Sequence, residues 1–394
     1  MERLQTGTFR NLTTLLVLAS CSAPADLGPE RRVGRELSGP AAPKTDPAIP
    51  RRERPDAALT SPKRTGVTDR SDAGEKGDAG GRVTQEGGAR QVAREVEAIL
   101  ALGGDHSTSI GLCREGSLQG GVALPLRGPG FIHNPRRPRE ARFATVETLQ
   151  AIMGAARVVV EEMPGPSLVV NDLCLRHGGP IAQHGSHQNG LDADILFFYL
   201  LPSGEPILPV GVPLDPQGWG WDFKDLTTAK DDVRLKLDPR RTWRFIWALL
   251  ERPEAAVQRI FIAEHLRTML LEEARRSRAP RKTRERFEQI TCQPGTPHDD
   301  HMHVRFFCAP EDIRAGCKDN FPIYPWRREQ LRALGIEPVI GSPSRRQRQK
   351  ARARTTTPAQ ARRRAGRMHR KVREFLDRRK SWQEKPSPGR VYCR

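Results

Sequence analysis

The sequence contains few aromatic residues and no long apolar run. Aromatic residues make up 6% and hydrophobic residues 37% of the 394 residues. No apolar run approaches the roughly 20 residues that a membrane-spanning helix needs, so a polytopic membrane protein is excluded. The low apolar content, together with 33 Pro and 35 Gly, predicts one packed core with long solvated segments rather than two or three full domains.

Several short motifs are also missing from the sequence. It has no Cys-x-x-Cys pair, so neither a cysteine zinc ribbon nor a thioredoxin-like redox motif is expected. It has no His-Glu-x-x-His motif, which excludes the metalloproteases that take their general base from that helix. No internal repeat is found, and this argues against a repeat architecture.

The positive charge is concentrated at the C-terminal end of the chain. Of the formal net charge of +19, a net +16 falls in residues 341–394, so the rest is nearly neutral. The overall basicity therefore says little about the core. The tail's scattered aromatics, Phe375, Trp382 and Tyr392, are too few for base stacking, and we expect no nucleic-acid partner. Residues 336–394 are predicted to form a basic, largely flexible tail with one candidate helix over residues 368–380.

The N-terminal segment resembles a bacterial lipoprotein signal. A weakly basic start and a short apolar run precede Leu18-Ala19-Ser20-Cys21, which has the form of a lipobox. We therefore expect residues 1–20 to be a signal peptide and Cys21 to be acylated. The prediction for localisation is the periplasm, with the protein tethered to a membrane. Residues 21–104, rich in Pro, Gly, Ala and charged groups, are predicted to be a disordered linker with a candidate short helix over residues 92–102.

The remaining cysteines agree with export. Their even number in an exported chain predicts disulfide bonds, although the sequence alone leaves the pairing open. These six disulfide candidates are Cys113, Cys174, Cys292, Cys308, Cys317 and Cys393.

Packed character is confined to residues 105–335, which we expect to form a single domain. Helices and strands do not alternate regularly in this region, so the expected fold class is α+β rather than a doubly wound parallel sheet. The predicted helices are residues 144–160, 242–251 and 264–275, and the predicted strands are residues 168–175, 190–200, 259–263 and 300–307.

Two short windows, residues 183–194 and 298–305, hold five of the ten histidines. Asp194 lies in the strand that follows the first window's Gly-rich loop. His301 and His303 are two residues apart on a strand, so their side chains project from the same face. Two imidazoles and one carboxylate are the donor set that holds catalytic zinc and leaves a position open. His177, outside both windows, is interpreted as an ordinary surface or hydrogen-bonded histidine.

The spacings within the windows resemble those of a known group of enzymes. His187 and Asp194 form His-x6-Asp, and His301 and His303 form His-x-His. These motifs resemble the zinc peptidases of the lysostaphin, D-Ala-D-Ala-peptidase and hedgehog fold group. The fuller strings at 186–195 and 298–305 resemble the penicillin-insensitive murein endopeptidase family. This resemblance covers roughly residues 107–317, and it implies a hedgehog/D-Ala-D-Ala-peptidase-like antiparallel sheet with flanking helices.

The resemblance also implies roles for individual residues. His187, Asp194 and His303 would bind Zn²⁺, with His184 as a candidate further ligand. His301 would be the catalytic histidine beside the metal, and His298 would assist it. Zinc lowers the pKa of bound water to about 7 and polarises a carbonyl group, and a nearby imidazole is suited to moving the proton.

The resemblance suggests two disulfide bonds as well. Cys308 and Cys317 correspond to a loop pair just after the last metal ligand. Cys113 and Cys393 correspond to a bond between the start of the domain and the C-terminal tail. Cys174 and Cys292 are then left to each other, and the resemblance does not support this third pair. The Trp219-Gly220-Trp221 segment diverges from the family, and its indoles are interpreted as either a stacking platform or core.

The function implied is hydrolysis of D-alanyl peptide cross-links in peptidoglycan by a zinc endopeptidase. Two alternatives stay open at this point. One is a carboxypeptidase of the same fold, which would trim the ends of stem peptides. The other is a non-catalytic cell-wall-binding module that has kept the metal site.

Overall fold

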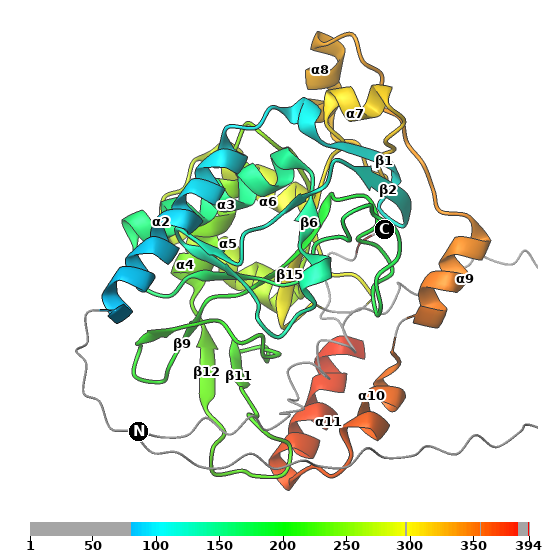
Figure 1. The fold of residues 1–394 in the computed structure, drawn as a ribbon. Helices are drawn as coiled ribbons and strands as arrows, with labels where there is room; N and C mark the ends of the chain where they lie inside the picture. The colour runs from blue at the N-terminus through cyan, green and yellow to red at the C-terminus, as the bar shows by residue number, and fades with distance from the viewer. Residues whose placement is uncertain (1–79, 296–297, 355, 385–392, 394) are drawn as a thin grey trace, which may run out of the picture. The chain divides into compact units, whose positions relative to one another are not determined.

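The computed structural model describes residues 80–295, 298–354, 356–384 and 393 (Figure 1). The expected signal peptide, Cys21 and most of the expected linker lie outside these residues. Within them the chain is a mixed α+β structure with several sheets, as the sequence predicts. None of the described helices combines the length and the apolar character needed to cross a bilayer.

Helices α3 and α4 begin where the sequence supplies a capping side chain. Thr145 accepts a hydrogen bond from the backbone N–H of Thr148 at the start of α3, and Asp238 does the same for Arg241 at the start of α4. The helices are α2 (Gly80–Leu100), α3 (Val146–Glu162), α4 (Pro239–Leu250), α5 (Glu264–Arg276), α6 (Arg281–Ile290), α7 (Pro310–Arg314), α8 (Pro325–Ala333), α9 (Arg345–Arg354), α10 (Pro358–Ala365) and α11 (Arg370–Glu384), with 3-10 turns at η1 (Gly104–His106) and η2 (Arg139–Ala141).

The central sheet has seven strands in the order β14-β13-β15-β8-β7-β5-β4 and is mostly antiparallel; only the β13–β14 and β5–β7 pairs are parallel. A second sheet has the order β10-β9-β12-β11, and β1–β2 and β3–β6 form two small antiparallel pairs. The strands are β1 (Thr108–Leu112), β2 (Glu115–Gln119), β3 (Val122–Ala123), β4 (Arg127–Gly128), β5 (Phe131–His133), β6 (Phe143–Ala144), β7 (Leu168–Val170), β8 (Asp192–Leu196), β9 (Tyr199–Leu200), β10 (Pro206–Ile207), β11 (Trp219–Trp221), β12 (Arg234–Leu237), β13 (Val257–Phe261), β14 (Thr291–Cys292) and β15 (His301–Phe306).

Strands β15 and β8, in the middle of the seven-stranded sheet, have one apolar face and one polar face. On β8, Ala193 and Ile195 are fully buried, and on β15 so are Met302 and Val304. These four side chains belong to one apolar core that also contains the buried faces of α3, α4, α5 and α6, and Figure 1 shows those helices as one group. Because alternate residues of a strand face opposite sides, the intervening polar residues are placed together on the other face.

Several predicted elements are confirmed with shifted ends. Helices α3, α4 and α5 and strands β13 and β15 lie close to their predicted ranges. The strand expected at 168–175 ends at Val170, and Cys174 pairs with Phe143 instead. The strand expected at 190–200 is divided into β8 and β9. The candidate helix near 92–102 is part of the longer α2, whose Val96 and Ile99 are buried in the main core.

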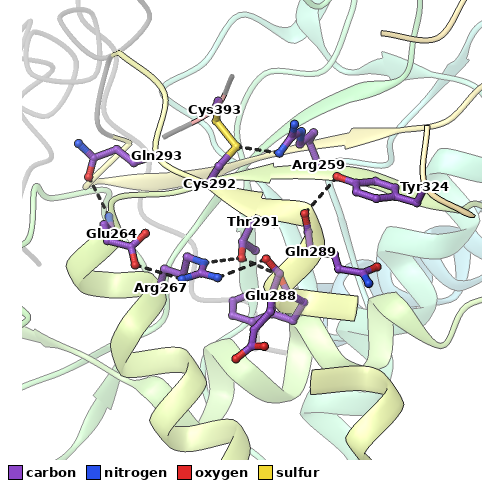
Figure 2. The surroundings of a disulfide bond; sticks show 11 residues. Arg259, Glu264, Arg267, Glu288, Gln289, Thr291, Cys292, Gln293, Tyr324 and Cys393 are labelled. Atoms are coloured by element: carbon purple, nitrogen blue, oxygen red, sulfur yellow. Dashed lines mark hydrogen bonds and ion pairs between the residues drawn. A yellow bond between two sulfur atoms is a disulfide. The ribbon is translucent and has the colours of Figure 1, made fainter. Parts of the chain in front are cut away.

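The disulfide bonds correct part of the prediction. Cys308–Cys317 is confirmed, but Cys393 bonds Cys292 rather than Cys113. Cys113 and Cys174 are both free and buried, so the Cys174–Cys292 pair is also wrong. The reason is the path of the C-terminal end, where the backbone N–H of Cys393 donates to Gln293 O (3.0 Å) beside β14. Figure 2 shows the Cys292–Cys393 disulfide and Arg259, which donates a hydrogen bond to the sulfur of Cys292 (3.2 Å).

The basic C-terminal segment contains three helices, α9 to α11, where the sequence suggested one. Helix α11 buries an apolar side against the loop that follows β11. The buried residues of this second cluster are Phe223, Leu226, Val372, Phe375, Leu376 and Trp382.

Candidate metal centre

The pairing of β8 with β15 brings the two histidine windows together. In this antiparallel pair, His303 lies directly opposite Asp194, and Arg305 lies opposite Asp192. Directly opposed residues of neighbouring strands are close enough for their side chains to interact. Two segments that are more than a hundred residues apart in the sequence therefore supply one buried cluster, to which the loop before β8 adds His187.

Three donor atoms form a small triangle at the centre of this cluster. His187 Nε2 lies 3.4 Å from Asp194 Oδ1, His303 Nδ1 lies 3.1 Å from the same oxygen, and the two nitrogens are 3.2 Å apart. A tetrahedral ion with bonds of about 2.0–2.1 Å separates its ligand atoms by about 3.3 Å. The three atoms are thus spaced as the ligands of one zinc-sized cation would be.

The polar atoms around this triangle support the same interpretation. Asp194 Oδ1 and His301 Nε2 are buried and make no hydrogen bond within the described part of the chain. Buried polar atoms normally have partners, because an unsatisfied one is unfavourable. A cation held by Asp194 would provide the missing partner for its oxygen.

Each imidazole has an oxygen atom close to its other nitrogen. His187 Nδ1 contacts the carbonyl oxygen of Leu173 (2.8 Å), which leaves Nε2 for the centre. His303 Nε2 lies 3.2 Å from Asp192 Oδ1, which leaves Nδ1. Partners of this kind fix the ring and its tautomer, as they do for most metal-binding histidines.

Asp192 is less suited than Asp194 to bind a cation, although it also lies beside His187 and His303. Its two oxygens accept hydrogen bonds from the Arg305 guanidinium (2.7 and 3.1 Å), and the backbone N–H of His187 donates to Oδ2 (3.0 Å). These contacts occupy both oxygens. Burial raises the pKa of Asp192, but Arg305 and His303 outweigh that effect and hold it well below the usual range.

His184 lies at the edge of the cluster. Its Nε2 contacts Asp172 Oδ2 (2.8 Å), and its Nδ1 lies 3.6 Å from Asp194 Oδ2. The His184 and His187 rings are 4.5 Å apart. Burial lowers the pKa of His184 well below its usual value, and the neighbouring His187 lowers it further. A neutral imidazole with one nitrogen directed at Asp194 is suited to a further metal contact.

His301 is placed beside the triangle and not in it. Its Nε2 lies 3.5 Å from Asp194 Oδ1, while its Nδ1 contacts Asp300 Oδ1 (2.8 Å). Burial alone would lower the pKa of His301, but the charges of Asp300 and Asp194 outweigh it and raise the pKa to about 10 in the metal-free chain. The His298 ring is 4.9 Å from the His301 ring. All six predicted site histidines and carboxylates are thus brought together.

The loop that carries His187 is held in an uncommon backbone conformation. His187 has φ 64°, and Gly190 has φ 81°. A non-glycine residue in the left-handed region is unfavourable unless its surroundings fix it, and such residues are often found at functional sites. The φ of 81° favours glycine at position 190, and a Cβ there would also lie 2.9 Å from a methyl carbon of Leu118.

The prediction from sequence missed the carboxylates and arginines that support the histidines. Asp172 is one of them; it contacts both His184 and Arg137. It follows β7 and lies outside both histidine windows. Asp192 and Asp300 lie inside the two windows, close to predicted site residues. That position could have identified them as supporting residues of the site.

The two indoles of β11, Trp219 and Trp221, have neighbours of their own. The Trp219 ring lies 4.0 Å from the Arg234 guanidinium carbon, and the Trp221 ring lies 5.4 Å from Lys371 Nζ. Both side chains are partly buried. Their interpretation as a substrate platform stays a prediction.

A buried set of imidazoles and a carboxylate on a mostly antiparallel sheet, with no cysteine among the donors, is the donor chemistry of a catalytic metal site. Comparison with protein families specifies the class further, because residues 109–360 match the model of the penicillin-insensitive murein endopeptidases. The chain belongs to this family of metallopeptidases and is an endopeptidase.

Curated relatives agree at low identity. A penicillin-insensitive murein endopeptidase of Klebsiella pneumoniae is 26% identical over 231 residues, which is 56% of this chain and 73% of the relative. The protein of the same description from Haemophilus influenzae is 27% identical over 236 residues, with the same two coverages. The residues that match the family model, 109–360, include both histidine windows and end before α11 begins.

Proposed function

We propose that this protein is a zinc-dependent DD-endopeptidase that hydrolyses D-alanyl cross-links in peptidoglycan. The observation that carries the proposal is the triangle of His187 Nε2, Asp194 Oδ1 and His303 Nδ1, whose sides of 3.1–3.4 Å suit one tetrahedral zinc ion. Its donors are nitrogen and oxygen atoms without thiolates, which is typical of a catalytic site with an open position. The names of the relatives support murein as the substrate.

The residues of the cluster have separate tasks in this proposal. His187, Asp194 and His303 would hold the ion, with His184 as a candidate further ligand. Bound zinc supplies Lewis acidity, which polarises a carbonyl group and lowers the pKa of water. Leu173 O and Asp192 keep two of the rings oriented, so little reorganisation is needed when substrate binds.

His301 is the residue that moves the proton. Its Nδ1 is held by Asp300, so Nε2 is the nitrogen that accepts a proton from the attacking water and later returns it to the leaving amine. The charges of Asp300 and, after it, Asp194 raise the pKa of His301. Coordination of Asp194 would weaken the smaller of these two contributions, and a proton-transfer group is most effective when its pKa lies near the working pH. His298, with its ring 4.9 Å away, assists.

We further propose that the protein acts in the periplasm, where peptidoglycan lies. Tethering through acylated Cys21 is part of this proposal and is supported only by the lipobox-like sequence Leu18–Cys21.

Digestion of purified sacculi tests the proposed reaction. We expect cross-linked muropeptide dimers to disappear and monomers to accumulate, with loss of activity after treatment with a zinc chelator and recovery when zinc is returned. His177→Ala, which changes an exposed histidine outside the cluster, is the control and should digest normally. Release of terminal D-alanine without loss of dimers would instead identify a carboxypeptidase. No change in the sacculi would reject both activities.

A further inference from the structure

A buried ion pair joins the C-terminal helix α11 to the segment before β15. The Arg379 guanidinium donates to both oxygens of Asp299, through Nη2 (2.6 Å) and Nε (3.0 Å), and the indole N–H of Trp382 donates to Oδ2 (3.0 Å). The side chains of Asp299 and Arg379 are 0% and 4% exposed. One helix therefore supplies the donors for a carboxylate that would be strongly unfavourable if it were buried without them.

Asp299 lies between two groups of the candidate metal centre. His298 comes directly before it, and Asp300, which contacts His301 Nδ1 at 2.8 Å, comes directly after it. His298 has φ 51°, a conformation that persists only where the surroundings fix it. The backbone N–H of Ala263 donates to His298 O (3.1 Å). Fixing the Asp299 side chain therefore restrains both neighbouring groups.

Helix α11 is anchored on both sides of this contact. At its beginning, His369 Nε2 lies 3.2 Å from Asp232 Oδ2. Along its length, Phe375 and Trp382 are buried in the second apolar cluster and pack edge to face. Beyond its end, Cys393 is bonded to Cys292 (Figure 2). These contacts allow the helix to hold Arg379 in a fixed place.

We propose that Arg379 and Trp382 are positioning residues of the metal centre. Through Asp299 they fix residues 298–300, and with them His298 and the Asp300–His301 pair. This inference rests on the proposed peptidase function and adds to it, because α11 lies beyond residues 109–360 that match the family. The bidentate geometry requires the planar fork of arginine, so a lysine would replace the charge but not the orientation.

Kinetics of full-length variants test the proposal. In Arg379→Gln and Trp382→Phe we expect kcat on a cross-linked muropeptide to fall by on the order of tenfold, because small displacements of catalytic groups slow the reaction. KM and bound zinc should stay within about twofold. Arg379→Lys should restore little. Arg378→Gln, the same change at the exposed neighbouring position, is the matched control and should behave as wild type.

Two further measurements separate positioning from general destabilisation. If both residues act through Asp299, the double variant Asp299→Asn/Trp382→Phe should be no slower than Asp299→Asn alone. In addition, the ¹⁵N resonances of the His301 ring should shift in Arg379→Gln and not in Arg378→Gln. Trp382→Phe keeps an aromatic ring, smaller than the indole, and removes the N–H that Asp299 accepts, so it remains informative if Arg379→Gln does not fold.

The outcomes distinguish this inference from the function on which it rests. Wild-type kcat in both Arg379→Gln and Trp382→Phe, in a protein whose wild type cleaves cross-links, would overturn the positioning role alone. Loss of zinc in parallel with kcat, or fully additive effects in the double variant, would also overturn it. A wild type that cleaves no cross-links would overturn both proposals.

Discussion

Asp194 is the residue on which the candidate metal centre depends most. Burial would raise the pKa of its carboxyl, but His187 and His301 outweigh this and hold it well below the usual range. The carboxylate is therefore ionised at physiological pH, and it is buried beside the imidazoles of His187, His301 and His303. Such a buried charge requires compensation, and a divalent cation bound between Asp194 and two neutral imidazoles provides it.

A second buried carboxyl, Asp312 on α7, predicts a dependence of stability on pH. It accepts a hydrogen bond from the backbone N–H of Ser109 (3.0 Å), but burial raises its pKa to about 7, with a further contribution from Glu147. The folded state thus binds the proton more tightly than the unfolded state. Stability is highest when this carboxyl is protonated in both states, and it is lost as the pH rises from about 4 to about 7.

Asp312→Asn removes this loss and keeps an acceptor for Ser109. We expect the variant to gain on the order of 2 kcal/mol in free energy of unfolding over wild type at pH 8, and much less at pH 4. Urea titrations at the two pH values would measure the difference. Glu329→Gln, an exposed change on α8, is the control. An equal gain at both pH values would show that ionisation of Asp312 is not the cause.

Among the secondary-structure elements, the sequence predicts which residues share a face of a strand, but it does not predict which strands pair. The alternation of side chains along a strand is enough to predict, from sequence alone, that His301 and His303 share one face of β15. The His-x6-Asp spacing of His187 and Asp194 adds the other ligands through the family resemblance. Periodicity cannot say that β15 lies beside β8, because the contact joins segments far apart in the chain. Arg379 was missed for the same reason, because it lies 80 residues from Asp299, which it contacts. Asp172 was missed because it lies outside both histidine windows, although it is only 12 residues from His184.

Two of the three predicted disulfide bonds also failed at this scale, and the corrected pairing of Cys292 with Cys393 can be tested. Burial raises the pKa of the Cys113 thiol to about 11 and that of Cys174 to about 12, so neither should react with an alkylating reagent in the native state. We expect both to be modified only after unfolding without reductant, and peptide mapping to recover Cys292–Cys393. Recovery of a Cys113–Cys393 peptide would restore the pairing implied by the family resemblance.

The whole molecule combines a nearly neutral catalytic part with a strongly basic C-terminal segment. The sequence suggested a largely flexible tail, whereas the structure describes helices there and buries Arg379. Most other arginines of α9 to α11 are exposed. We interpret this charge as a means of raising the local concentration of anionic cell-wall polymers, an attraction that salt would screen. One segment would then serve both attraction of substrate and support of the metal centre.

The central claim is that His187 and His303 bind the metal while His301 acts beside it. Zinc content and sacculus digestion measured in parallel for His187→Ala, His303→Ala and His301→Ala test it most directly. We predict one zinc per chain in the wild type and loss of both zinc and activity in the first two variants. His301→Ala should keep its zinc and lose activity by about 10²–10⁴-fold. Loss of zinc from His301→Ala in proportion to its activity, or full zinc and activity in His187→Ala, would contradict the account.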